Sequence, residues 1–190
     1  GQAILANNLG DLQRQMGDYA SATHYFRIAL EQFRRLGSDY GMAVLHMNMG
    51  SVKVSQQALA EARYHLEQSE QLFERTGSEE FLAELYCAYA ELGLHEQQLP
   101  KALQSANAAL TLARRRDARA DEAAALRVRS LIMSTMGQPD VACTDMQHAC
   151  EIFAEIGNPQ AVTRCEQDLV RMTAVQDREA PPDERHSQGI

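Results

Sequence analysis

The stretch NLGDLQRQMGDYASATHYFRIALEQF, residues 8–33, contains two helical patterns separated by a break. Apolar residues recur at helical spacing up to Met16, and Gly17-Asp18 then interrupts the pattern. The helical pattern resumes at Tyr19, with Ala22 and Phe26 on one side. Because a stop is followed at once by a new start, the stretch predicts two antiparallel helices joined by a short turn.

This pattern returns with a period of 40 residues, and no gap is needed to align the copies. Small residues allow helices to approach closely, and large apolar residues fill the space between them. One hairpin cannot bury both of its faces alone, so the repeat predicts a stack of four hairpins. We call the residues that occupy the same position in the four copies a column. Four columns hold only small residues: Ala3, Ala43, Ala83 and Ala123; Gly10, Gly50, Ala90 and Ser130; Ala22, Ala62, Ala102 and Ala142; and Ala29, Ser69, Ala109 and Ala149. Two columns hold large apolar residues: Leu12, Val52, Leu92 and Ile132; and Phe33, Phe73 and Phe153, with Ala113 as the exception.

The columns also predict individual contacts and helix ends. We expect Gly10 to face Ala22 within the first hairpin, and Phe26 and Phe33 to reach the following unit. Between units, each helix should end at a residue in the left-handed conformation and be followed by an N-cap. The predicted left-handed residues are Gly37, Gly77, Asp117 and Gly157, and the predicted N-caps are Ser38, Ser78 and Asn158.

The repeat resembles the tetratricopeptide repeat family. Leu9-Gly10, Gly17-Asp18-Tyr19, Ala22, Phe26 and Ala29-Leu30 match its signature, and the resemblance covers about residues 3–156. It departs from the family pattern at Gln57-Ala58 and Gln97-Gln98, which lack the turn glycine, and at Arg129, where a leucine is usual. The family unit has about 34 residues, so this longer unit is similar to the long-repeat subclass of bacterial regulators related to the maltose activator, kinesin light chains and Pins-type adaptors.

The expected fold class is therefore all-α, a right-handed α-α superhelix. It consists of one solenoid over residues 1–175, with units at about 3–42, 43–82, 83–122 and 123–158 and a capping helix at 159–175. The polar residues 176–190 have no apolar period and are expected to be disordered. Ile4 and Leu5 begin a bare N-terminal edge, which upstream repeats or a second copy of the chain, forming a homodimer, are expected to cover.

Composition excludes several functional classes. A net charge of −8 argues against nucleic acid as a partner, since phosphates require a basic surface. The chain has no apolar run long enough to span a membrane. Its four cysteines form no CxxC pair and are expected to be reduced thiols, which favours a cytoplasmic location. Cys143, His148 and Cys150 lie close in sequence, but their spacing fits helix packing better than a metal site, and no cofactor is predicted.

In the family, the first helix of each hairpin lines a concave face, and ligand contacts come from that helix. The resemblance therefore implies a groove that is apolar in the middle and charged toward both ends, suited to a protein or peptide partner. Only two lysines occur, Lys53 and Lys101, and neither falls in a groove column, which argues against the chaperone-binding clamp of some members. The predicted partner-binding residues are Asn7, Asp11, Arg14, Met47, Ser51, Val54, Cys87, Glu91, Leu94, Arg127, Leu131, Ser134, Arg164 and Arg171.

No catalytic motif is present: there is no phosphate loop, nucleophile elbow or zinc-protease helix. The expected function is a protein-interaction module, the C-terminal regulatory repeat segment of a larger bacterial signalling protein. Two alternatives stay open at this point, a free-standing adaptor of similar architecture and a sensor that closes its groove around a small molecule or peptide signal.

Overall fold

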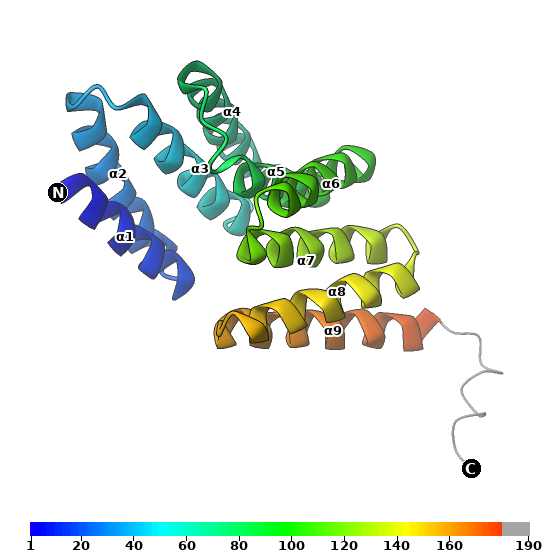
Figure 1. The fold of residues 1–190 in the computed structure, drawn as a ribbon. Coiled ribbons are helices and arrows are strands. Elements are labelled where there is room, and N and C mark those ends of the chain that lie inside the picture. Colours follow the sequence, from blue (N-terminus) through cyan, green and yellow to red (C-terminus); the bar gives the residue numbers. More distant parts are fainter. Residues whose placement is uncertain (180–190) are drawn as a thin grey trace, which may run out of the picture.

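The computed structural model describes the backbone of residues 1–179 and the side chains of residues 1–172. Within these residues the chain forms nine helices and no strand, as the sequence predicts (Figure 1). None of the described helices is both long and apolar enough to cross a membrane. The helices are α1 (Gln2–Gln15), α2 (Tyr19–Arg35), α3 (Asp39–Ser55), α4 (Leu59–Thr76), α5 (Leu82–His95), α6 (Leu99–Arg115), α7 (Arg119–Thr135), α8 (Pro139–Glu155) and α9 (Pro159–Glu179).

Successive helices pair as four hairpins that stack along a curved path (Figure 1). The second helix of each hairpin packs against the first helix of the next, and α9 packs against α8 at the end of the stack. The first helices also contact one another, α3 with α5 and α5 with α7, and α7 in turn contacts α9. The odd-numbered helices therefore form an inner layer and the even-numbered helices an outer one.

The hairpin boundaries differ in detail from the expected units. Two hairpins begin at Asp39 and Arg119, four residues before the expected boundaries at 43 and 123. The last helix extends to Glu179, past the expected end at residue 175. The rest of the predicted disordered tail, residues 180–190, lies outside the described residues.

A residue with a positive φ angle stands at every turn, at intervals of 20 residues. Between hairpins these are Gly37, Gly77, Asp117 and Gly157, as predicted. Within the second and third hairpins, Gln57 and Gln97 take φ angles of 60° and 58° without the usual glycine. The turn conformation is thus kept even where the residue is unfavourable for it.

The start of α5 differs from the prediction. Ser38 and Asn158 cap their helices, accepting hydrogen bonds from the backbone N–H groups of Gly41 and Ala161. Ser78 does not cap a helix, because α5 begins only at Leu82. The extra residues form a loop between α4 and α5. Arg116 secures this loop by donating hydrogen bonds to the carbonyl oxygens of Glu79 and Glu80, the first at 2.9 Å, and Phe81 stacks on Phe73 with ring centroids 6.4 Å apart.

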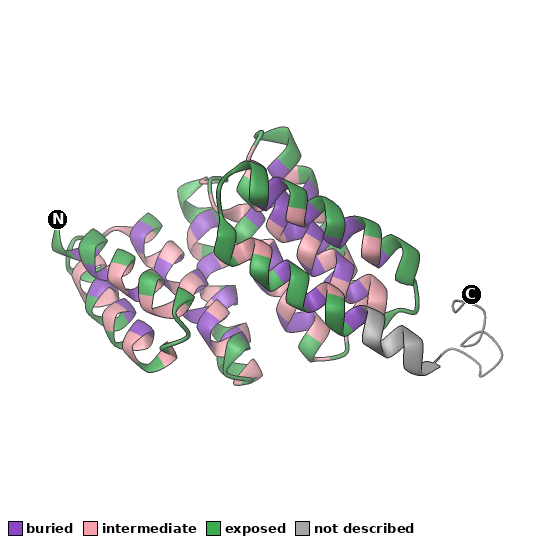
Figure 2. Cartoon of the chain, turned by 90° about the horizontal axis from the view of Figure 1, so that it is seen from below, coloured by how far each residue is buried: buried purple, intermediate pink, exposed green. Residues whose placement is uncertain are grey.

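The predicted small columns are buried at the helix contacts, and purple segments run through the centre of the stack in Figure 2. The column of Leu12 is an exception. Val52, Leu92 and Ile132 are buried, whereas Leu12 is 50% exposed. The later three residues are buried by the preceding hairpin, and α1 has no described helix on that side.

Gly10 makes room for a large side chain of its own hairpin. A Cβ atom on Gly10 would lie 2.5 Å from the Phe26 ring, so Phe26 covers Gly10 within its own hairpin. In the second hairpin Leu66 covers Gly50 in the same way. The equivalent positions hold Ala90 with Ala106, and Ser130 with Met146, all buried. Phe33 does reach the following hairpin, where its ring leaves no room for a side chain at Gly41.

Two departures from the repeat pattern are paired polar groups. Arg129 donates two hydrogen bonds of 2.7 Å to the buried Asp145 carboxylate on α8, which satisfies a charge in a column that is otherwise apolar. His46 is half-buried, and its Nδ1 lies 3.0 Å from Nδ1 of His65. Burial, together with His65 and Arg34, lowers the pKa of His46 to about 4.

Replacing Gln57 by glycine should stabilise the protein. A left-handed conformation costs a non-glycine residue about 1–2 kcal/mol, and glycine's greater loss of backbone freedom cancels roughly 0.5–1 kcal/mol of the gain. We expect the free energy of unfolding to rise by about 0.5–1 kcal/mol in urea denaturation. The matched control is Gln56→Gly, which should lower stability because φ is −84° there. Equal effects at both positions would contradict this view of the turn.

The contact between Gly50 and Leu66 can be tested by a double-mutant cycle. Gly50→Ala should destabilise the fold, because overpacking costs about 1–3 kcal/mol, and Leu66→Ala should cost about 2–5 kcal/mol by leaving a cavity. The double variant recreates the Ala90–Ala106 pair of the third hairpin, so its loss of stability should be smaller than the sum of the single losses. Simple additivity would show that the two residues do not share one space.

Candidate binding groove

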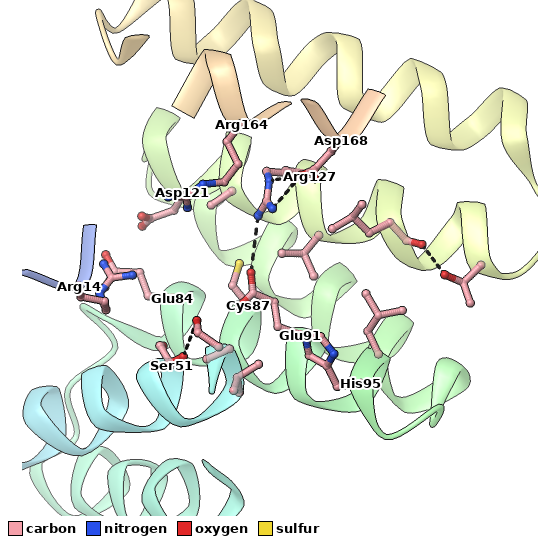
Figure 3. Close-up of a pocket in the computed structure, with 18 of the residues that line it drawn as sticks. Arg14, Ser51, Glu84, Cys87, Glu91, His95, Asp121, Arg127, Arg164 and Asp168 are labelled. Atoms are coloured by element: carbon pink, nitrogen blue, oxygen red, sulfur yellow. Dashed lines mark hydrogen bonds and ion pairs between the residues drawn. The ribbon is translucent and has the colours of Figure 1, made fainter. Parts of the chain in front are cut away.

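The inner helices enclose a hollow of about 910 Å³ on the concave side of the stack. Side chains from α1, α3, α5, α7 and α9 line it, so every hairpin and the last helix contribute. Figure 3 shows its centre, where α5, α7 and α9 bring charged side chains toward one another. We call this hollow the concave groove.

Twelve of the fourteen residues predicted from the repeat register line this groove. Asn7 and Asp11 do not. Asn7 accepts a hydrogen bond of 3.1 Å from the side-chain amide of Asn48, and Asp11 forms a 2.6 Å ion pair with Arg14. The twelve are Arg14, Met47, Ser51, Val54, Cys87, Glu91, Leu94, Arg127, Leu131, Ser134, Arg164 and Arg171.

The apolar middle of the groove is less accessible than predicted. Met47 is only 4% exposed and Val54 only 2%, and both belong to the core cluster between the second and third hairpins. They form the floor of the groove and offer little contact area. Leu94 and Leu131 are partly exposed, so they are the predicted apolar residues that a ligand can reach.

Several groove residues were missed by the sequence reasoning. Glu84 occupies the same repeat column as Arg164, which was predicted to line the groove. Applying that column to every hairpin therefore also predicts Glu84. Asp168 belongs to a neighbouring column, whose members Asn48, Ala88 and Val128 also line the groove. The 40-residue period therefore predicts that this whole column faces the groove. Tyr19 and Phe153 lie on the second helices of hairpins, and no column of the first helices identifies them.

Arg127 connects three inner helices at the centre of the groove. Its guanidinium group donates a hydrogen bond of 2.9 Å to Asp168 on α9 and forms an ion pair of 2.8 Å with the same carboxylate. It also lies 3.6 Å from the Glu91 carboxylate on α5. The side chains of Arg127 and Asp168 are only 18% and 9% exposed. This ion pair holds α9 in place, because each charge would be poorly solvated without the other.

One edge of the groove collects charge where the inner helices begin. Glu84 and Asp121 lie in the first turns of α5 and α7, and their carboxyl groups are close enough to interact. Burial raises the pKa of Glu84, and the negative charges of Asp121 and Asp11 add to this effect. Burial likewise raises the pKa of Asp121. Arg14 and Arg164 lie beside these carboxyl groups (Figure 3).

The opposite edge carries less charge. Leu94 lies in the last turn of α5 and Leu131 near the end of α7, together with Ser134 and Thr135. His95 also lies here and contacts the Gln57 side chain at 3.2 Å. The groove thus has one edge with several charges of both signs and one edge where apolar and polar groups lie with Arg171. Such an arrangement can position a bound chain in one orientation across the groove.

Removing Arg127 should loosen the last helix. Arg127→Ala leaves the Asp168 carboxylate buried without its main partner, which we expect to cost about 2–4 kcal/mol. Hydrogen exchange should then accelerate in the described part of α9 and remain unchanged in α1 and α2. The matched control, Arg164→Ala, removes an exposed arginine of α9 and should change stability by less than about 0.5 kcal/mol. Equal effects of the two variants would contradict a fastening role for Arg127.

Comparison with known proteins agrees with this architecture. The family model for the tetratricopeptide repeat matches residues 1–75, which cover the first hairpin and nearly all of the second. No curated protein matches the chain. Repeats of this family generally mediate protein–protein interaction and typically form non-enzymatic modules. The hairpin that the family model matches recurs twice more in the same register, so the whole stack is similar to tetratricopeptide repeats.

Proposed function

We propose that the concave groove binds a peptide segment of a partner protein, and that the chain acts as an interaction module rather than as an enzyme. One observation carries the proposal: a continuous hollow is lined by all five inner helices. A ligand in this hollow contacts all four hairpins at once, so it can gain affinity from many small contacts. The twelve predicted residues that line the hollow are the proposed binding site, in which Met47 and Val54 form the floor.

The charges of the groove indicate what the partner segment should carry. The charged edge presents acidic Glu84 and Asp121 between Arg14 and Arg164. A segment with a basic residue opposite the carboxyl groups and an acidic residue opposite an arginine satisfies this edge. Pairing a basic side chain with Glu84 also favours its ionised form, which the groove alone disfavours.

The second edge favours an apolar side chain on the same segment. Leu94 and Leu131 are partly exposed and lie on neighbouring inner helices. An amphipathic segment therefore fits the groove with its apolar side on these leucines and its charged side on the opposite edge.

The wider context belongs to the same proposal. The resemblance to long-repeat bacterial regulators supports a regulatory segment of a larger signalling protein, with the partner segment as the regulated input. The binding test below does not depend on this context, because it examines the groove itself.

Selection from a random peptide library on the whole chain tests the proposed function. We expect the selected peptides to carry charges of both signs and an apolar residue, and to bind in fluorescence anisotropy. Leu131→Glu should weaken binding at least roughly tenfold, because it places a charge where an apolar side chain packs. This variant changes a partly exposed position, so it tests binding more cleanly than a substitution at the buried Met47.

Ile28→Glu is the matched control, since Ile28 is an exposed apolar residue of α2 that does not line the concave groove. It should bind the selected peptides as the unchanged protein does. If no peptide is selected, or if both variants bind equally well, the concave groove is not the binding surface. Circular dichroism of both variants shows whether each is folded.

A further inference from the structure

Two cysteine side chains face each other across the last helix pair. Cys150 lies on α8 and Cys165 on α9, and these antiparallel helices are joined by the turn at Gly157. The two thiol groups are close enough for each to affect the pKa of the other. Cys165 is fully buried in the last core cluster, and the partly buried Cys150 packs against the same cluster. Two cysteines from different helices therefore lie near each other in one packed interface.

The repeat register shows why these positions meet. Leu30 and Leu45 occupy the equivalent positions between the first and second hairpins and share one core cluster. Leu110 and Ala125 occupy them between the third and fourth hairpins and also share a cluster. The fold thus brings this pair of positions together repeatedly, and the last contact is the one where both side chains can form a covalent bond.

We infer that Cys150 and Cys165 form a reversible disulfide, which fastens α9 to α8 when a disulfide oxidant such as oxidised glutathione is present. The Cys150 thiolate attacks one sulfur of oxidised glutathione, breaks its S–S bond and releases one glutathione thiolate. Cys165 then loses its proton, and its sulfur attacks the Cys150 sulfur of the mixed disulfide and releases a second glutathione. Two protein thiols are oxidised, and one glutathione disulfide is reduced to two thiols.

The order of these steps follows from exposure. Cys150 is the more accessible of the two, so it meets the oxidant first, and the buried Cys165 resolves the mixed disulfide. Burial raises the pKa of Cys150, and burial together with the neighbouring Cys150 raises that of Cys165 to about 12. The thiolate is the reactive form, so oxidation should be slow at neutral pH and faster in alkali. Glu151 and Glu166 add to the raised pKa of Cys150, and Asp168 raises and Arg127 lowers that of Cys165.

The disulfide has a consequence for the concave groove. Cys165 follows Arg164 and lies three residues before Asp168, and both of these residues line the groove. Fastening α9 to α8 therefore fixes the groove wall that the last helix forms. This consequence rests on the proposed function, whereas formation of the disulfide does not.

The test is oxidation of the whole folded chain with oxidised glutathione at about pH 8.5, where more thiolate is present. Peptide mapping by mass spectrometry should find Cys150 and Cys165 in one linked peptide pair, lighter by two hydrogen atoms and separated again by dithiothreitol. The melting temperature should rise on oxidation, because the bond closes a loop in the unfolded chain. Formation should also be faster at about pH 8.5 than at neutral pH.

Three variants make the result specific. Cys143→Ser removes the other cysteine of α8 and should leave the linked peptide and the rise in melting temperature unchanged. Cys150→Ser and Cys165→Ala should abolish both, and alanine is suited to position 165 because Ala125 occupies the equivalent position. The proposal is overturned if folded protein gives only glutathione adducts, links through Cys143 or no reaction. These outcomes do not depend on whether the concave groove binds a peptide.

Discussion

The close approach of two helices at one small residue is the contact on which the rest of the structure depends. Phe26 fills the space over Gly10, and Leu66 fills the space over Gly50. In the third hairpin both positions are alanine, so a larger residue at the first position accompanies a smaller one at the second. This contact sets the separation of the helices within each hairpin. Because the same contact recurs in every hairpin, the hairpins are similar enough in shape to stack.

The even spacing of the turns aligns the inner helices, and the aligned helices form the concave groove. Residues with positive φ occur every 20 residues, so the inner helices of the four hairpins end at matching positions along the chain, at residues 15, 55, 95 and 135. Residues 40 positions apart then lie side by side on neighbouring inner helices. The concave groove is therefore a set of columns, and substitutions within a column change its chemistry without changing its position. Glu84 and Arg164 stand in one such column with opposite charges.

Much of this arrangement could be predicted from the sequence, because periodicity specifies which face of a helix a residue occupies. The small columns and most groove residues follow from that face. Periodicity does not specify how far a side chain on that face is buried. Met47 and Val54 lie on the predicted face, but the neighbouring hairpin buries them. It also does not specify which residues meet across two helices, so it does not identify Phe26 as the residue that covers Gly10. Ser78 was misassigned as a cap because Phe81 and Arg116, on either side of the third hairpin, hold a longer loop there.

The most direct measurement of the central contact is nuclear magnetic resonance of the folded chain. A Leu66 methyl group packs where a Gly50 side chain would be, so a strong nuclear Overhauser effect should connect that methyl group with the Gly50 Hα protons. The Phe26 ring should likewise shift the Gly10 Hα resonances upfield through its ring current. Random-coil shifts at both glycines, with no effect between Leu66 and Gly50, would contradict the account of how these helices pack.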